Sequence, residues 1–294
     1  MRVIRSRILG FCMGVRRAVE MAWRESSPQN NEATDKRVYT LGPLIHNPTV
    51  LADLEERGIK ALKEGEILPE GPGRENVTVI IRAHGVSPDA ESALAAQGVR
   101  ILDATCPHVK ASQKKARELS REGFFVFLAG EKEHAEIIGV RGYIEGPCSI
   151  VANPAGAEEA ARELALNSPG VKTALIGQTT ILQEEYISIG ERIKRYFPAL
   201  RIIDTICRST RDKQNALREL SGQVDAFVIA GGRESANTRR LLSIAEGCGK
   251  RAWLVEDVSG IPAELSSCSV IGLAAGDSTP DGLIDRIEEA LAAM

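Results

Sequence analysis

Three of the six cysteines occupy comparable places in the sequence, and cysteine thiolates are the ligands that soft metals and iron–sulfur clusters prefer. Cys106 and Cys207 each end an Asp-x-x-Cys segment that follows a short apolar run, and their offset is 101 residues. Cys12 ends a similar apolar-rich run near the N-terminus. Because no Cys-x-x-Cys pair occurs, the spacings of zinc ribbons and clustered ferredoxins are excluded. The cysteines are therefore either solitary core residues or ligands that the fold gathers from distant positions.

A second set of polar residues repeats with nearly the same period. A glycine stands four residues before a His or Ser three times, at Gly42 and His46, Gly130 and His134, and Gly231 and Ser235. Three further apolar runs end at His84, Thr179 and Ser278. The chain therefore reads as three copies of about 98 residues, each with a cysteine, then a His or Ser, then a His, Thr or Ser.

Three thiolates without a fourth partner predict a metal centre with an open coordination position. Zinc usually completes a tetrahedron, whereas a cubane iron–sulfur cluster takes one thiolate for each iron. Three cysteines would leave the fourth iron free to act as a Lewis acid. Predicted helices begin beside Cys12 and Cys106, and a helix N-terminus favours the thiolate form. The remaining cysteines have no repeat counterpart, and we expect small buried side chains at Cys148, Cys248 and Cys268.

The other repeated positions are rich in neutral hydrogen-bond donors and poor in lysine. This set, with nearby helix N-termini, suits an anion such as a phosphate or diphosphate. Asn237 and Glu136 stand two residues after Ser235 and His134. Glu136 is the only carboxylate in these positions, so it is either a proton donor or a helix-start glutamate that the dipole favours. His108 lies outside the pattern, and we expect it on a helix surface.

Apolar, β-branched runs alternate with helical stretches, for example at 110–122, 212–220 and 281–293. Such alternation predicts parallel sheets, whose functional residues lie at the carboxyl ends of strands. We expect an α/β fold of three similar lobes with small parallel sheets around a pseudo-threefold axis and a central iron–sulfur cavity. The predicted lobes span 1–105, 106–206 and 207–294. Three unrelated α/β units could share the same order of strands, turns and helices, but that alternative does not explain a cysteine in the same place three times.

Composition narrows the class of protein. The chain has 294 residues, 43% of them hydrophobic, and a net charge of −3. These values fit a globular protein and disfavour a nucleic-acid partner, which would require a basic surface. No apolar run reaches the length of a membrane span, and the first residues do not resemble a secretion signal. We therefore expect a cytoplasmic protein without a membrane partner. The sequence also lacks a GxxxxGK[ST] loop, so a nucleotide-binding site of the P-loop kind is not supported.

Over essentially its whole length, the chain resembles the 4-hydroxy-3-methylbut-2-enyl diphosphate reductase family of the non-mevalonate isoprenoid pathway. Many ordered motifs carry this resemblance, and any one alone would be weak. The motifs are Gly10-Phe-Cys-Met-Gly-Val15, His46-Asn47, Ala83-His-Gly-Val86, Asp103-Ala-Thr-Cys-Pro107, His134-Ala-Glu136, Gln178-Thr-Thr180, Cys207 with Thr210 and Gln214, Ser235-Ala-Asn237, and Gly276-Asp-Ser278.

The resemblance implies a [4Fe-4S] cluster held by Cys12, Cys106 and Cys207, with a fourth iron that binds the substrate hydroxyl. It implies that His134, Glu136 and Thr179 lie near that hydroxyl as catalytic residues, with Glu136 supplying protons. The residues expected to bind the diphosphate are His46, His84, Ser235, Ala236, Asn237 and Ser278. The implied products are isopentenyl and dimethylallyl diphosphate, and a ferredoxin or flavodoxin would donate the electrons one at a time.

Two departures from the family pattern occur. Ser235-Ala236-Asn237 replaces a common Ser-Ser-Asn, which removes one hydroxyl and keeps the backbone N–H, and His134-Ala135-Glu136 replaces His-Pro-Glu. Three alternatives remain at this stage. They are a quinolinate-synthase-like dehydratase, a non-catalytic iron–sulfur redox sensor, and a structural zinc protein, which would want a fourth ligand.

Overall fold

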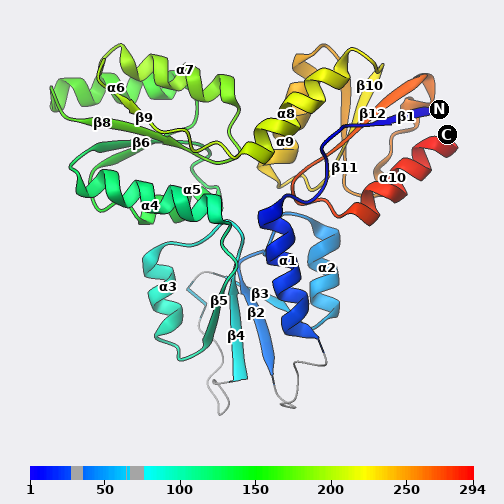
Figure 1. The fold of residues 1–294 in the computed structure, drawn as a ribbon, viewed down its shortest axis with the longest axis horizontal. Coiled ribbons are helices and arrows are strands. Elements are labelled where there is room, and N and C mark those ends of the chain that lie inside the picture. Colours follow the sequence, from blue (N-terminus) through cyan, green and yellow to red (C-terminus); the bar gives the residue numbers. More distant parts are fainter. Residues whose placement is uncertain (28–35, 64, 67–75) are drawn as a thin grey trace. The chain divides into compact units, whose positions relative to one another are not determined.

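A computed structural model describes residues 1–27, 36–63, 65–66 and 76–294 (Figure 1). Within these ranges, strands alternate with helices along most of the chain, and the strands form three four-stranded sheets. Every strand pairing in the three sheets is parallel. The predicted α/β class with small parallel sheets is therefore confirmed.

The three sheets have equivalent strand orders. The first has the order β3-β2-β4-β5, from β2 (Arg37–Leu41), β3 (Lys60–Leu62), β4 (Val77–Ile81) and β5 (Arg100–Asp103). The second has the order β7-β6-β8-β9, from β6 (Phe125–Ala129), β7 (Cys148–Val151), β8 (Thr173–Gly177) and β9 (Arg201–Ile202). The third has the order β11-β10-β12-β1, from β10 (Ala226–Ala230), β11 (Arg251–Val255), β12 (Val270–Ala275) and β1 (Arg2–Arg5).

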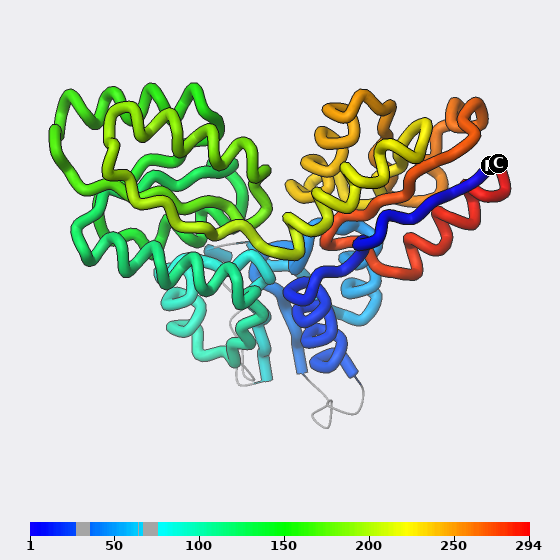
Figure 2. The backbone as a smooth tube through the Cα atoms, turned by 45° about the horizontal axis from the view of Figure 1, so that its top comes forward, coloured from blue at the N-terminus to red at the C-terminus, as the bar shows by residue number. Residues whose placement is uncertain are grey.

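The inner strands explain why the repeat is visible in the sequence. All five residues of β4, β8 and β10 are buried, as expected for parallel strands covered on both faces. The third sheet is completed from the other end of the chain, because β1 pairs with β12 from Arg2 opposite Val270 to Arg5 opposite Leu273. The two termini consequently lie side by side (Figures 1 and 2).

The described residues form ten α-helices, nine of them between strands and α10 after the last strand: α1 (Met13–Ser26), α2 (Pro48–Glu56), α3 (Pro88–Ala95), α4 (Pro107–Arg121), α5 (Ala135–Gly142), α6 (Pro154–Asn167), α7 (Gln183–Lys194), α8 (Arg208–Ser221), α9 (Ala236–Gly247) and α10 (Asp281–Ala293). The helices predicted at 110–122, 212–220 and 281–293 correspond to α4, α8 and α10. Four helices begin with a proline, which needs no N–H partner in the first turn. Helix α8 begins four residues before the predicted stretch, because its first turn is polar and lacks the apolar period.

The described chain divides into two compact units. One comprises 1–23, 43–59 and 208–294, and the other comprises 24–42 and 60–207. In the first unit, the apolar face of α10 packs on β10 and β12 through residues such as Ile284 and Ile287. The second unit has separate cores for its two sheets. Lobe boundaries at 105 and 206 remain a prediction, and β1 belongs to the sheet built mainly from residues 226–275.

Among the described helices, none is both long and apolar enough to serve as a membrane-spanning segment.

Candidate functional site

Each of the three repeated cysteines lies directly before a helix. Cys12 precedes α1, Cys106 is the N-cap residue of α4, and Cys207 precedes α8. The carbonyls of Cys12 and Cys106 accept the first helical hydrogen bonds, from the amides of Arg16 and Lys110, both at 2.9 Å. All three side chains are half-buried and free of disulfides. The predicted helix starts beside Cys12 and Cys106 are confirmed, and Cys207 has the same placement.

The backbone amide of each cysteine is bound to a turn at the end of a neighbouring strand. The turns follow β12, β4 and β8, and they carry the predicted positions Ser278, His84 and Thr179. The pairs are Cys12 with the Asp277 carbonyl at 3.2 Å, Cys106 with the Ala83 carbonyl at 3.0 Å, and Cys207 with the Thr179 carbonyl at 2.9 Å. The fold thus brings a cysteine beside a residue of the predicted anion-binding or catalytic set in each sheet.

The Asp-x-x-Cys repeat has a local structural reason. The Asp103 carboxylate accepts a hydrogen bond from the Thr105 amide at 2.8 Å, and Asp204 does the same for Ile206 at 3.3 Å. These Asx turns reverse the chain after the strand, so that the cysteine reaches the helix start. Burial raises the pKa of Asp103, but hydrogen bonds from Lys110 and Thr105 outweigh burial and leave the pKa below its usual value.

In the second unit, Cys106 has an acidic neighbourhood. Burial raises the pKa of the Cys106 thiol, the amides of His108 and Val109 oppose this shift in part, and the charges of Cys207 and Glu136 raise it further. Cys106, Cys207 and Glu136 therefore share one electrostatic environment. Metal coordination would offset this cost, because it holds a coordinating thiol in the deprotonated form.

Glu136 and Thr179 form a buried pair in the second unit. Glu136 lies in the first turn of α5 and is 2% exposed. Its Oε1 accepts the Thr179 amide at 2.7 Å, and its Oε2 lies 2.8 Å from the Thr179 hydroxyl. Since the Thr179 carbonyl also accepts the Cys207 amide, a short chain of contacts joins the predicted proton donor to a predicted cluster ligand. The helix-start reading of Glu136 is confirmed, and its role as a proton donor stays a prediction.

The same turn fixes the protonation pattern of His134. His134 is the N-cap residue of α5, and its Nδ1 accepts the Glu136 amide at 3.2 Å. A neutral imidazole that accepts through Nδ1 carries its proton on Nε2, and we assign that tautomer from this contact. The His84 ring lies edge-on to the His134 ring, with centroids 5.3 Å apart. His84, His134, Glu136 and Thr179 thus lie within one compact unit.

The first unit gathers His46, Ser235 and Ser278. The Ser278 hydroxyl donates to the His46 carbonyl at 3.0 Å. A Cβ at Gly232 would lie 2.5 Å from that carbonyl, so this close approach requires glycine. Ser235 caps α9, its hydroxyl accepting the Thr238 amide at 3.3 Å. The turns that carry these predicted diphosphate ligands therefore meet around the His46 backbone.

Asn237 is a buried residue of this group whose side-chain amide has no hydrogen-bond partner among the described residues. It lies in the first turn of α9 and is 3% exposed. An unsatisfied buried amide costs on the order of 1–3 kcal/mol, so Asn237 is a candidate for contact with a polar ligand. Beside it, the N-terminus of α9 offers the amides of Ala236 and Asn237, which an α-helix leaves unpaired.

The residues outside the repeat behave mainly as expected. His108 is exposed on α4, and Cys268 is buried in the core of the first unit. Cys148 in β7 and Cys248 at the end of α9 are half-buried rather than buried, unlike the small buried side chains that we expected. Sequence reasoning missed the buried pair of Lys213 and Asp277, because a charged residue on a polar helix reads as surface.

The structure defines an α/β protein of three parallel sheets, with a cysteine at a helix start beside a polar turn at each of them. A family profile described as "LytB protein" matches residues 3–292. The chain therefore belongs to the LytB family.

Curated relatives agree with this assignment over their whole length. A 4-hydroxy-3-methylbut-2-enyl diphosphate reductase of Treponema denticola is 44% identical, with 99% of each chain covered. The enzyme of that name from Caldanaerobacter subterraneus subsp. tengcongensis is 36% identical, covering 100% of this chain and 98% of the relative.

Two solved structures share the fold. The E-1-hydroxy-2-methyl-but-2-enyl-4-diphosphate reductase of Plasmodium falciparum gives a TM-score of 0.87 at 25% identity, covering 98% of this chain and 87% of that one. A structure of (E)-4-hydroxy-3-methyl-but-2-enyl diphosphate reductase, described as the terminal enzyme of the non-mevalonate pathway, gives 0.68 at 33% identity with full coverage of both chains.

Proposed function

We propose that the chain is an oxidoreductase that removes the hydroxyl group of (E)-4-hydroxy-3-methylbut-2-enyl diphosphate. Two electrons and two protons convert this substrate into isopentenyl or dimethylallyl diphosphate and one water. The observation that best supports the proposal is the pairing of each helix-start cysteine with a turn of the polar set. Family membership and the names of the full-length relatives support the same reaction.

The proposed cofactor is a [4Fe-4S] cluster with Cys12, Cys106 and Cys207 as ligands. The donor set fits, because three half-buried thiols at helix N-termini can coordinate as thiolates. When bound, the cluster supplies single electrons and a Lewis-acidic iron that has no protein thiolate. The electron donor we propose is a ferredoxin or flavodoxin. A reducing compartment such as the cytoplasm, our proposed location, keeps such thiols available.

Glu136 is the proposed proton source for the departing water. Its Oε1 accepts an amide N–H, which leaves Oε2 as the oxygen that would take up a proton and pass it on. Oε2 lies 2.8 Å from the Thr179 hydroxyl, which can relay or orient that proton. His134 presents Nε2–H as a further donor, since its Nδ1 is engaged by the Glu136 amide. In this arrangement, the α5 turn and the turn after β8 deliver protons to one hydroxyl group.

The diphosphate is the proposed partner for the polar turns. Asn237 Nδ2 and the α9 N-terminal amides of Ala236 and Asn237 would donate to phosphate oxygens. The Ser235 and Ser278 hydroxyls and the imidazoles of His46 and His84 complete the set.

The test begins with anaerobic protein. We expect about four irons and four sulfides per chain, and a Mössbauer signal of one iron that changes when the substrate is added. Glu136→Gln should lower turnover at least about 100-fold while the iron content stays unchanged. Glu133→Gln is the matched control, because Glu133 is exposed next to α5. Zinc in place of iron would overturn the proposal. A cluster whose Mössbauer signal does not change when the diphosphate substrate is added would overturn it too.

A further inference from the structure

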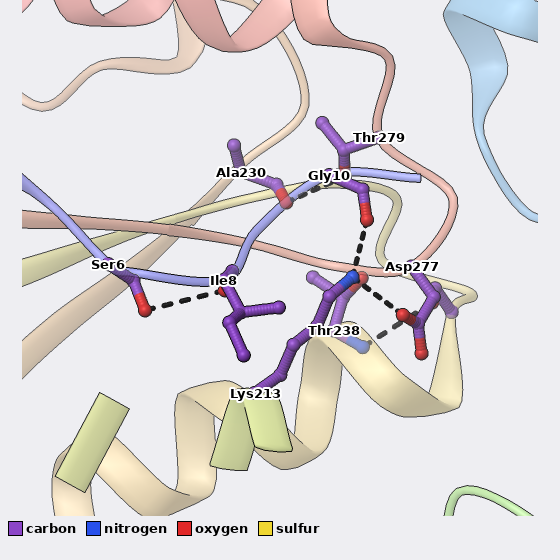
Figure 3. A network of polar contacts seen from close by, with 9 residues as sticks. Ser6, Ile8, Gly10, Lys213, Ala230, Thr238, Asp277 and Thr279 are labelled. Atoms are coloured by element: carbon purple, nitrogen blue, oxygen red, sulfur yellow. Dashed lines mark hydrogen bonds and ion pairs between the residues drawn. The ribbon is translucent and has the colours of Figure 1, made fainter. Parts of the chain in front are cut away.

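Lys213 is a lysine buried inside the first unit. It lies on α8 and is 2% exposed, although lysine is almost never fully buried without a partner. Its ammonium is 2.6 Å from a carboxylate oxygen of Asp277 and also donates to the Gly10 carbonyl (Figure 3). Both partners are far away in the sequence, so this contact joins three separate segments of the chain.

The two partners flank residues of the proposed site. Gly10 stands two residues before Cys12, and Asp277 stands one residue before Ser278. The Cys12 amide donates to the Asp277 carbonyl at 3.2 Å, so Asp277 receives the cysteine loop through its backbone and Lys213 through its side chain. One buried charge is therefore linked to both the proposed cluster ligand and the proposed diphosphate ligand.

The loop between β1 and α1 is bound at both ends and contacts Lys213 through the Gly10 carbonyl between them. Its start is fixed where the Ser6 amide donates to Leu273 of β12 at 2.8 Å, and its end is fixed at Cys12. Gly10 has φ +77, and a Cβ there would lie 2.9 Å from a carboxylate oxygen of Asp281. Its backbone therefore occupies a tight position with a carbonyl directed at Lys213 (Figure 3).

We propose that Lys213 is a positioning residue that holds the Cys12 loop against the turn carrying Ser278. The ammonium spans a neutral carbonyl on one segment and a carboxylate on the other, so neither segment can move without breaking a buried charge contact. Removing one partner of such a pair is strongly unfavourable. The role of Lys213 at the site rests on the proposed function, whereas the ordering of the loop does not.

Hydrogen exchange of the full chain without its cluster tests the ordering directly. In Lys213→Met, amides of the segment 8–13 should exchange at least about tenfold faster than in the parent, while the β10 segment keeps its protection. Lys213→Arg retains the charge and should stay within about threefold of the parent. Lys250→Met is the matched control, because Lys250 donates to the Val224 carbonyl at 2.8 Å in the same unit.

A second variant covers the case in which Lys213→Met fails to fold. Lys213→Met combined with Asp277→Asn removes both charges, so no carboxylate is left buried alone, and its 8–13 segment should still exchange at least about tenfold faster. Parent-like exchange in a folded Lys213→Met or double variant would overturn the proposal. Equal acceleration across all segments would do so too, because it would show a general loss of stability.

The holoenzyme provides an independent readout. An iron chelator should extract iron at least about tenfold faster from Lys213→Met than from the parent, the Arg variant or the Lys250 control. If segment 8–13 exchanges faster in Lys213→Met but the parent protein itself binds no iron, the proposed function fails and the positioning role of Lys213 survives. If iron is bound and released at the parent's rate, Lys213 does not position Cys12.

Discussion

The carboxylate of Glu136 accepts two hydrogen bonds from one residue, Thr179, through its amide at 2.7 Å and its hydroxyl at 2.8 Å. Glu136 begins α5, which follows β6, and Thr179 lies in the turn after β8, 43 positions away. This double contact fixes the rotation of the carboxylate and so decides which oxygen can hand over a proton. It also keeps a buried acid satisfied by hydrogen bonds, which a lone carboxylate would lack.

The Thr179 hydroxyl should therefore matter to turnover more than to binding. Thr179→Val keeps the amide bond to Glu136 and removes the hydroxyl, and we expect kcat to fall about 100-fold, with substrate affinity changed much less. Thr179→Ser keeps the hydroxyl and should retain most of the parent's activity. Steady-state kinetics with a chemical reductant measure both parameters. An unchanged kcat in the valine variant would exclude a role for this hydroxyl in proton delivery.

Asn237 should show the opposite pattern. Asn237→Leu removes an amide that has no partner within the described chain, so we expect KM to rise about 10- to 100-fold, as for the loss of a hydrogen bond to a charged group. The melting temperature should stay the same or rise, because an unsatisfied buried group is lost. Calorimetry of the substrate-free protein checks this second effect.

The N-cap Asn153 is the matched control for Asn237. Its side chain accepts the Gly156 amide at 2.9 Å at the exposed start of α6. Asn153→Ala should lower stability by about 1 kcal/mol and leave KM unchanged. If Asn237→Leu destabilised the protein like a lost cap and left KM unchanged, Asn237 would be a structural residue rather than a diphosphate ligand.

The central strands and the cysteine turns could be predicted because each is a local signal. Strand β4 is a run of five buried residues, and the Asp103 turn uses hydrogen bonds within two residues of the aspartate. The pairing of β1 with β12 carries no such signal, because Arg2 and Arg5 make the strand read as half-exposed and its partner lies at the other end of the chain. The roles of these residues as cluster ligands, diphosphate ligands and a proton donor came from the family resemblance and not from local sequence patterns.

Lys213 shows the same limit within the site. Helix α8 has an amphipathic pattern in which Ala216, Leu217 and Leu220 are buried, and Lys213 lies with them. Only the tertiary fold supplies the Asp277 carboxylate and the Gly10 carbonyl that make burial of this lysine favourable. A single sequence assigns such a residue to the surface, since the acceptors come from segments more than 60 residues away.

Asp103 should make stability depend on acid pH. Its folded-state pKa is lowered, so its stabilising contribution is present above the usual aspartate pKa and is lost as the pH falls through the lowered value. Asp103→Asn removes this dependence, so the free-energy difference between parent and variant should be largest near neutral pH and shrink in acid. Urea unfolding across this range measures it. A difference that grew as the pH fell would contradict the assigned direction.

Cys106 should be slow to alkylate in the cluster-free protein. Burial, with the charges of Cys207 and Glu136, raises its pKa, so less thiolate exists at neutral pH than for a free cysteine. Glu136→Gln removes one of these negative charges and lowers that pKa, so iodoacetamide should modify Cys106 faster at pH 7.5 in the variant than in the parent.

Cys148 is the internal control for this measurement. Burial also raises its pKa, while its opposing charge comes from Arg141 rather than from an acid shared with Cys106. Peptide mass spectrometry reports both alkylation rates in one sample, so the ratio of Cys106 to Cys148 cancels changes in reagent and folding. At pH 7.5, the ratio of the Cys106 rate to the Cys148 rate should be higher in Glu136→Gln than in the parent. This difference should disappear once the pH exceeds the raised pKa of Cys106, because the Cys106 thiol is then ionised in both proteins. A constant ratio would mean that Glu136 does not act on Cys106, and the shared electrostatic environment assigned to them would be wrong.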